Sequence, residues 1–409
     1  MKLASTITLE QNDRQFERQS EIELLLCCSR THPDSLQINQ IQALVRQPLD
    51  WNYILERATY HNVLPLLDRQ IQQLKPGTIP TEVIEQLQAN FNENFQRNLH
   101  LTAELVKLSR LFESQSIPMM SFKGPILAQI AYGNLALRQF VDLDILVAEA
   151  DVLATSQLLI SQGYESQFAL TDRQQTVYTG LRSEQWFWHE EKQLCIDLHW
   201  SILPKYYSFT PDRQLLWTKT NLVEFGSQSV TTLNAEHLLL FLCAHGSKHN
   251  WSKLYWICDI AELLRTNRDL DWEYISSLVG KFGTQRMLWL GLYLAHQLFS
   301  ANLPESLLFQ LESDSKLPIL FTQIKEIIFH PQAICAGLVE KTSTNSQDAV
   351  YRQTMTSFRD RSWYWIDTIL TPTPLEWQIV TLPQALFPLY YLIRLIRLSL
   401  KHIFRVSEA

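Results

Sequence analysis

Two acidic residues alternate with apolar ones in the segment Val141–Val147, VDLDILV. Strict alternation predicts a β-strand, in which residues two apart point to the same face. Asp142 and Asp144 would then lie side by side, while the apolar residues, Val141 included, pack into the core. Two carboxylates held so close repel each other unless a cation lies between them, so the pattern favours a divalent metal site. A strand with a solvated acidic face is the alternative, because an Asp-x-Asp motif alone is common.

A second candidate strand, Leu194–Trp200 (LCIDLHW), repeats this pattern. It would place Asp197 and His199 together on one face. If this strand lies beside the first, Asp197 adds a third carboxylate, and three carboxylates can hold two Mg²⁺ or Mn²⁺ ions for phosphoryl transfer. Asp197 would then be both a metal ligand and the base for the nucleophile. His199 is either a phosphate contact or a core histidine.

Basic residues precede the first strand. Lys123 and Gly124 join the apolar run IPMMSF to a predicted helix, KGPILAQIAYG. Glycine permits close backbone approach and a helix N-terminus favours anions, so we expect a triphosphate to bind here, unless Lys123 is an ordinary surface lysine. Arg138, four residues before Asp142, could bind phosphate oxygens or pair with Asp142 and orient it.

Two histidines further along the chain, His245 and His249, are four residues apart in a predicted helix and so share a face. Such a pair could chelate zinc with a third ligand from His237 or Asp259, although the spacing does not match the HExxH motif. Packing between helices is the simpler interpretation.

The elements that position these residues belong to a chain that we predict to be α+β and predominantly α. Only 11 of the 409 residues are glycine, and long stretches rich in Leu, Gln, Glu, Arg and Ala favour helix. Strands are also predicted near 164–170 and 184–189, within a β-containing unit. We expect three regions: an N-terminal helical region at 1–100, a core at 101–230 and a C-terminal helical region at 231–409.

Charge and composition restrict the partners and the compartment. The formal net charge of −7 gives no general attraction to polyanions, so long nucleic acids are poor candidate substrates. Six cysteines without a CxxC pair, and an N-terminus without the apolar run of a signal peptide, predict a cytoplasmic protein. Arg394 and Arg397 interrupt the apolar segment Leu382–Leu400, which argues against a transmembrane helix. With Lys401 they form a basic helical face, predicted to be a weak membrane-surface or protein-docking element.

The stretch FKGPILAQIAYGNLALRQFVDLDILV, followed by CIDLHW and by HGSKHNWSKLYWICDIAELL, resembles an uncharacterised bacterial nucleotidyltransferase family of the DNA polymerase beta-like superfamily. The resemblance covers about residues 40–400. It implies a small mixed β-sheet core flanked by helices, the three aspartates as catalytic metal ligands, and a nucleoside triphosphate (NTP) as substrate. Because the helical unit closes over the cleft in this superfamily, contacts of His245 and His249 with the nucleotide or acceptor become more plausible.

One departure from the superfamily pattern concerns the residues ahead of the acidic pair. The superfamily usually has Gly-Ser or Gly-Gly there, whereas this chain has Gly124-Pro125, and proline offers neither an N–H nor a hydroxyl. We expect a metal-dependent nucleotidyltransferase that moves a nucleoside monophosphate (NMP) group to an unidentified small-molecule or protein acceptor and releases pyrophosphate. The alternative is a catalytically silent binding or scaffold protein that retains the fold.

The acidic cluster also predicts how a substitution behaves. Asp144→Asn should abolish nucleotide transfer. It should leave the metal-free stability level or higher, because it removes one of several repelling charges.

Overall fold

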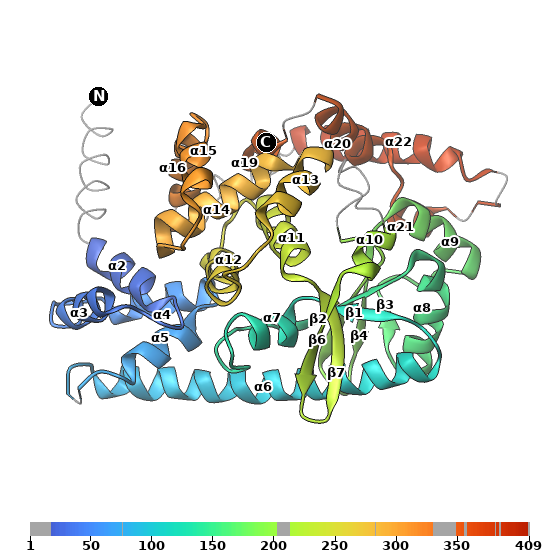
Figure 1. The fold of residues 1–409 in the computed structure, drawn as a ribbon. Coiled ribbons are helices and arrows are strands. Elements are labelled where there is room, and N and C mark those ends of the chain that lie inside the picture. The colour runs from blue at the N-terminus through green and yellow to red at the C-terminus, as the bar shows by residue number, and fades with distance from the viewer. Residues whose placement is uncertain are drawn as a thin grey trace.

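The computed structural model describes residues 18–75, 77–202, 213–282, 284–329, 349–355, 358–380, 382–383 and 386–407. These residues form a mostly helical structure with a five-stranded mixed sheet and a two-stranded hairpin, which confirms the predicted α+β class. Figure 1 shows the long helix α6 (Thr81–Ser114) running beneath the sheet and beneath several of the other helices.

Four shorter helices precede α6. Their bounds are α2 (Gln19–Cys28), α3 (Ser35–Leu44), α4 (Trp51–Tyr60) and α5 (Leu64–Ile71). Side-chain caps begin two of them. Asp34 accepts a hydrogen bond from the Gln37 N–H, and the Gln37 side chain accepts one from the Asp34 N–H, which is a capping box for α3. Asp50 caps α4 by accepting from the Tyr53 N–H. The N-terminal helices predicted from the sequence are therefore present.

The sheet has the strand order β1-β2-β5-β4-β3. The strands are β1 (Met119–Ser121), β2 (Asp142–Val147), β3 (Glu165–Ser166), β4 (Glu184–His189) and β5 (Leu194–His199). The elements between them are α7 (Gly124–Ile130), η1 (Glu149–Asp151), α8 (Val152–Ser161) and α9 (Asp172–Leu181). β2 and β5 pair in parallel, and the other neighbours pair antiparallel. The two strands with the aspartates are thus adjacent in the sheet.

A separate hairpin joins β6 (Thr220–Phe225) to β7 (Gln228–Leu233). The individual strands predicted from the sequence do not include these two. The sequence does contain a signal for a hairpin, because Gly226 lies between two runs rich in Thr and Val. In the structure Gly226 has the positive φ of +64° that a tight turn favours.

Helices make up most of the rest of the described chain. They are α10 (Arg213–Thr218), α11 (Ala235–Lys248), α12 (Leu254–Thr266), α13 (Trp272–Phe282), α14 (Gln285–Phe299), α15 (Glu305–Ser313), α16 (Leu317–Phe329), α19 (Ala349–Thr354), α20 (Phe358–Leu370), α21 (Pro374–Ile379) and α22 (Leu389–Ser407). No helix in the described part is long and apolar enough to cross a membrane.

Two hydrophobic cores lie on either side of the sheet. One core contains Leu143 and Ile145 of β2, Ile196 of β5 and residues of α6 such as Leu105. The other contains Leu146 of β2 and joins the helices that precede α6 to α11, α12, α14 and α16. Burial of apolar surface therefore brings together helices from the two ends of the chain. It also places a large helical body against one face of the sheet.

Two expectations from the sequence need correction. Val141 is 65% exposed rather than buried, because β2 begins only at Asp142 and Val141 precedes the alternating strand. Arg394 and Arg397 do not form an open basic face on α22, because both contact the buried carboxylate of Glu376. The side chain of Lys401 lies outside the described residues.

Candidate metal centre

The register of β2 and β5 brings two aspartates side by side. Asp144 of β2 lies directly opposite Asp197 of β5 in the parallel pair. Opposed residues of neighbouring strands project to the same face of a sheet, so both carboxylates leave the sheet together. Leu143 and Ile196, one residue earlier on each strand, are buried in the core on the opposite face. The alternation predicted for both strands is confirmed.

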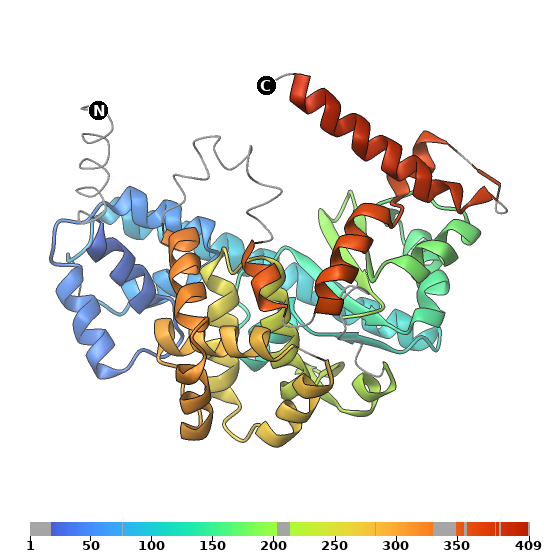
Figure 2. The ribbon, with the colours of Figure 1, turned by 90° about the horizontal axis from the view of Figure 1, so that it is seen from above.

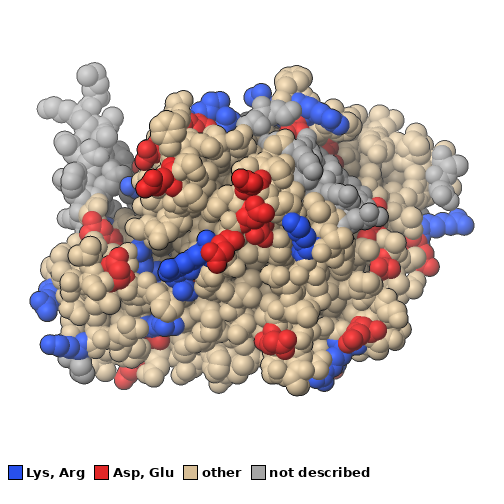
Figure 3. All heavy atoms as spheres, viewed as in Figure 1, with Lys and Arg blue, Asp and Glu red and all other residues tan. Residues whose placement is uncertain are grey.

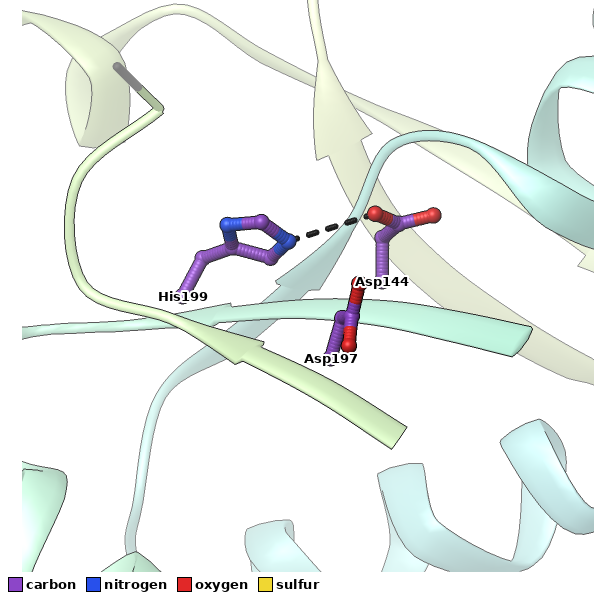
Figure 4. A group of neighbouring side chains, drawn as sticks. All are labelled: Asp144, Asp197 and His199. Atoms are coloured by element: carbon purple, nitrogen blue, oxygen red, sulfur yellow. Dashed lines mark hydrogen bonds and ion pairs between the residues drawn. The ribbon is translucent and has the colours of Figure 1, made fainter. Parts of the chain in front are cut away.

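His199 completes a compact group of three side chains. Asp144, Asp197 and His199 each offer a ligand atom, and these atoms lie within 4.8 Å of one another. Figure 4 shows the His199 ring pointing from β5 toward Asp144, with Asp197 on the same strand. Asp142 also lies on β2 and alternates onto the same face as Asp144, but it is not a member of this group.

Lys123 lies against the same carboxylate. Its Nζ is 2.5 Å from Oδ1 of Asp144, and its side chain is only 13% exposed. Lys123 is the N-cap residue of α7, and Gly124 begins that helix at a φ of +50°. A Cβ at Gly124 would lie 3.3 Å from the backbone oxygen of Asp142. Glycine therefore permits the close approach between α7 and β2 that sets Lys123 beside Asp144.

Asp144 is held in its ionised form by two basic groups. Burial alone would raise the pKa of Asp144, but the Lys123 ammonium, followed by the hydrogen bond from His199, lowers this pKa to about 2. The Nε2 of His199 is 3.2 Å from Oδ1 of Asp144 and donates to it. Burial alone would lower the pKa of His199, but the hydrogen bond to Asp144 and the Glu184 carboxylate outweigh this effect and raise it. Both shifts favour the ionised forms of Asp144 and His199.

The pKa values of Asp142 and Asp197 are raised, in contrast to that of Asp144. Burial, and then the neighbouring Asp144 carboxylate, raise the pKa of Asp142 to about 6. Burial also raises the pKa of Asp197, although His199 opposes this. Within the described part of the chain neither carboxylate has an ion pair. Carboxylates that are destabilised in this way gain from a bound cation, so the residues fit a divalent ion with oxygen ligands.

Two further charged residues, Glu184 and Lys248, extend the site. Glu184, the first residue of β4, lies opposite His199, and its Oε2 is 3.5 Å from His199 Nδ1. Lys248 of α11 places its Nζ 3.4 Å from Glu184 Oε1. Glu184 opens a strand that the sequence does predict, but only the pairing of β4 with β5 reveals its neighbour. These contacts continue the charge network from the sheet to α11.

The histidines of α11 lie close to this network without joining the metal-ligand group. The Phe241 ring of α11 is 5.6 Å from Lys123 Nζ and 5.6 Å from the half-buried ring of His245. Burial, and then the Lys123 ammonium, lower the pKa of His245 well below its usual value. His249 stacks on Trp256 at 5.1 Å between ring centroids. Among the described residues, no zinc-type group forms around His245 and His249.

The remaining candidate, Arg138, has a different partner from those considered. Its Nε and Nη2 donate to the two carboxylate oxygens of Asp259 at 2.8 and 2.9 Å. Tyr132 also donates to Asp259, at 2.7 Å. The pairing of Arg138 with Asp142, one of the two predicted alternatives, is therefore not formed. Arg138 is 4% exposed and connects the segment before β2 to α12. The two partners are 121 residues apart in the sequence, so no local pattern could predict the pair.

A known protein family matches more than half of this chain. Residues 47–300 match the family described as an uncharacterised nucleotidyltransferase. A crystal structure of an antigenic nucleotidyltransferase-like protein from Paracoccidioides brasiliensis is similar over 46% of this chain and 92% of that chain, with 15% sequence identity and a TM-score of 0.29. No curated protein matches the sequence. The family match spans both aspartate strands and α11, and the chain belongs to the uncharacterised nucleotidyltransferase family.

Proposed function

We propose that the protein transfers an NMP group from an NTP to an acceptor hydroxyl, phosphate or amine. An acceptor oxygen or nitrogen forms a bond to the α-phosphorus. The bond between the α-phosphorus and the bridging oxygen of the β-phosphate breaks, and pyrophosphate leaves with that electron pair. The acceptor's proton passes to a base of the site. The observation that carries this proposal is the pairing of Asp144 with Asp197 on neighbouring parallel strands.

Each residue of the site has a proposed role. Asp197 accepts the acceptor's proton, a role that its raised pKa favours. When Asp144 has gained another cation, Lys123 moves onto the triphosphate oxygens. Its mobile ammonium then binds a phosphate more favourably than it binds this carboxylate. His199 keeps Asp144 oriented through its hydrogen bond. The His245 and His249 side of α11 contributes contacts to the nucleotide or acceptor.

Divalent cations, Mg²⁺ or Mn²⁺, belong to this proposal. Asp144 and Asp197 would hold them, with Asp142 at the edge of the site. A bound ion would supply positive charge to the triphosphate and lower the pKa of the attacking group. Support comes from Asp142 and Asp197, whose carboxylate pKa values are raised and which have no ion pair among the described residues.

The acceptor is proposed to be a small molecule or a protein rather than a long nucleic acid. A formal net charge of −7 offers no broad attraction to a polyanion. The cytoplasm remains the expected compartment, since Cys28, Cys243 and Cys258 are buried free thiols.

The test is incubation of the protein with each labelled NTP, Mg²⁺ or Mn²⁺ and a cell extract, followed by mass spectrometry of whatever gains a nucleotide. Wild type is expected to label an acceptor, and Asp197→Asn to label none. Asp269→Asn changes an exposed aspartate outside the site and should label as wild type does. Labelling that survives in Asp197→Asn would overturn the assignment of the base and metal ligand.

A silent binding or scaffold protein is the second candidate function. It is favoured by Pro125, which removes one backbone N–H from the start of α7, and by Lys123, which already neutralises Asp144. The two functions differ in ligand binding. An active enzyme should show a rise in melting temperature with Mg²⁺ and NTP, whereas a protein that binds neither shows no rise.

A further inference from the structure

Helix α22 turns Arg394 and Arg397 toward the rest of the protein and leaves several apolar side chains exposed. Arg394 Nη2 donates to the backbone oxygen of Thr368 at 2.6 Å. Arg397 pairs with the carboxylate of Glu376, which is 0% exposed. Tyr390, one turn earlier on the same face, is 1% exposed. The side of α22 that faces the protein thus carries the arginines, the reverse of an ordinary surface helix.

The outer side of α22 carries a row of exposed apolar residues. Leu389, Leu392, Ile396 and Leu400 are 44%, 55%, 52% and 48% exposed. They are spaced by three or four residues, so they form one stripe along the helix. Single exposed apolar side chains are common, but a continuous stripe marks an interaction surface. Figure 2 shows α22 extending away from the rest of the molecule.

Helix α20, which packs against α22, adds to this surface. Trp363, Ile366 and Ile369 are 50%, 42% and 42% exposed. They too are spaced by three residues and share one side of their helix. In Figure 3 the surface over α22 is mostly free of charged side chains. Tryptophan beside aliphatic residues is the composition found where proteins meet the headgroup region of a membrane.

The charge of this part of the chain indicates the kind of partner. Residues 349–409 contain seven Lys and Arg against four Asp and Glu, a net charge of +3, in a chain whose net charge is −7. The rest of the chain therefore carries −10. A second copy would bring two positive segments together, which is unfavourable. An anionic lipid surface attracts such a segment, and it accepts an apolar stripe at the same time.

We propose that the outer face of α22, with the exposed side of α20, docks the protein on an anionic lipid surface. The helix lies in the plane of the membrane interface, with Leu392 and Ile396 inserted among the acyl chains and with the exposed Arg359 and Arg361 of α20 near the headgroups. This placement agrees with the finding that no described helix can cross a membrane. The proposal does not depend on nucleotide transfer.

Flotation of the full chain with lipid vesicles tests this proposal. Wild type should float with phosphatidylglycerol vesicles and not with phosphatidylcholine vesicles, and added salt should weaken the binding. Leu392→Glu combined with Ile396→Glu should reduce binding by at least about tenfold, because two inserted side chains become charged. Leu222→Glu is the matched control, since Leu222 is 66% exposed on β6, away from α22. It should bind as wild type does.

Circular dichroism checks that the double variant is folded. If it is not, Leu392→Gln with Ile396→Gln replaces it, because glutamine keeps high helix propensity. The proposal is overturned if wild type does not float with phosphatidylglycerol, or if a folded double variant floats as well as wild type. It is also overturned if light scattering finds a wild-type dimer that the double variant converts to monomer, because the stripe would then bind a second copy.

Discussion

The ammonium group of Lys123 lies 2.5 Å from a carboxylate oxygen of Asp144, in the position where a cation would bind that carboxylate. The lysine comes from the start of α7 and the aspartate from β2. The protein therefore supplies its own counter-ion to the site. A divalent ion that takes the place of Lys123 at Oδ1 of Asp144 would displace the ammonium, and a triphosphate would give it a new partner. Metal and nucleotide binding should favour each other.

We expect Lys123→Met to bind Mn²⁺ about tenfold or more tightly than wild type when no nucleotide is present, because the competing ammonium is gone. The same variant should bind NTP more weakly. Paramagnetic resonance of free Mn²⁺ measures the first effect. Lys192→Met is the control, since Lys192 Nζ makes a similar contact, 2.7 Å from Glu104, outside the site. An unchanged Mn²⁺ affinity in Lys123→Met would show that the lysine does not compete.

The sequence predicts that metal-free Asp144→Asn is as stable as wild type or more stable, and the ion pairs of Asp144 reverse that prediction. Loss of the carboxylate leaves Lys123 and His199 without their buried partner, which should cost about 3–5 kcal/mol of unfolding free energy. Asp197→Asn should keep wild-type stability or exceed it, because Asp197 has a raised pKa and no ion pair among the described residues. Urea unfolding in EDTA distinguishes the two variants. Equal stability of Asp144→Asn and wild type would mean that the charged network contributes little.

Asp142 should give the metal-free protein a characteristic pH dependence. Its pKa rises from the ordinary 3.8 to about 6 in the folded state, so the folded state holds the proton more tightly than the unfolded chain. The resulting stability is complete below pH 3.8 and is lost as the pH rises toward about 6. Asp142→Asn has no carboxyl group at this position, so its stability does not change with pH in this way. The melting temperature of wild type relative to Asp142→Asn should therefore fall across this pH range in EDTA, and a constant difference would exclude the raised pKa.

Arg138 should act as a structural residue. Arg138→Lys cannot reproduce two parallel hydrogen bonds to Asp259, and about 3–5 kcal/mol of stability should be lost with the buried pair. The loss is measured by urea unfolding. Arg97→Lys changes a partly exposed arginine that pairs with Glu93 at 3.9 Å and should alter stability by less than about 0.5 kcal/mol. If Arg138→Lys is fully stable but binds NTP poorly, a phosphate role would be favoured instead.

The sequence predicted the two strands that carry the aspartates and the residues on each of their faces. Alternation over β2 and β5 set which residues face the core and which face away, because side-chain direction in a strand depends only on position. Gly124 indicated a close backbone approach at the start of a helix, and long stretches rich in helix-forming residues predicted a mostly α chain. These features are local, so one stretch of residues is enough to reveal them.

Tertiary structure decided which of these residues meet. Asp144 pairs with Lys123 and His199, and Arg138 pairs with Asp259. These pairings depend on strand order and helix docking, which no local pattern encodes. The same holds for Arg394 and Arg397, whose regular spacing on α22 predicted an open basic face until Glu376 proved to lie beneath them. A charged side chain takes its role from its partner, and the partner is chosen by the packing of distant segments.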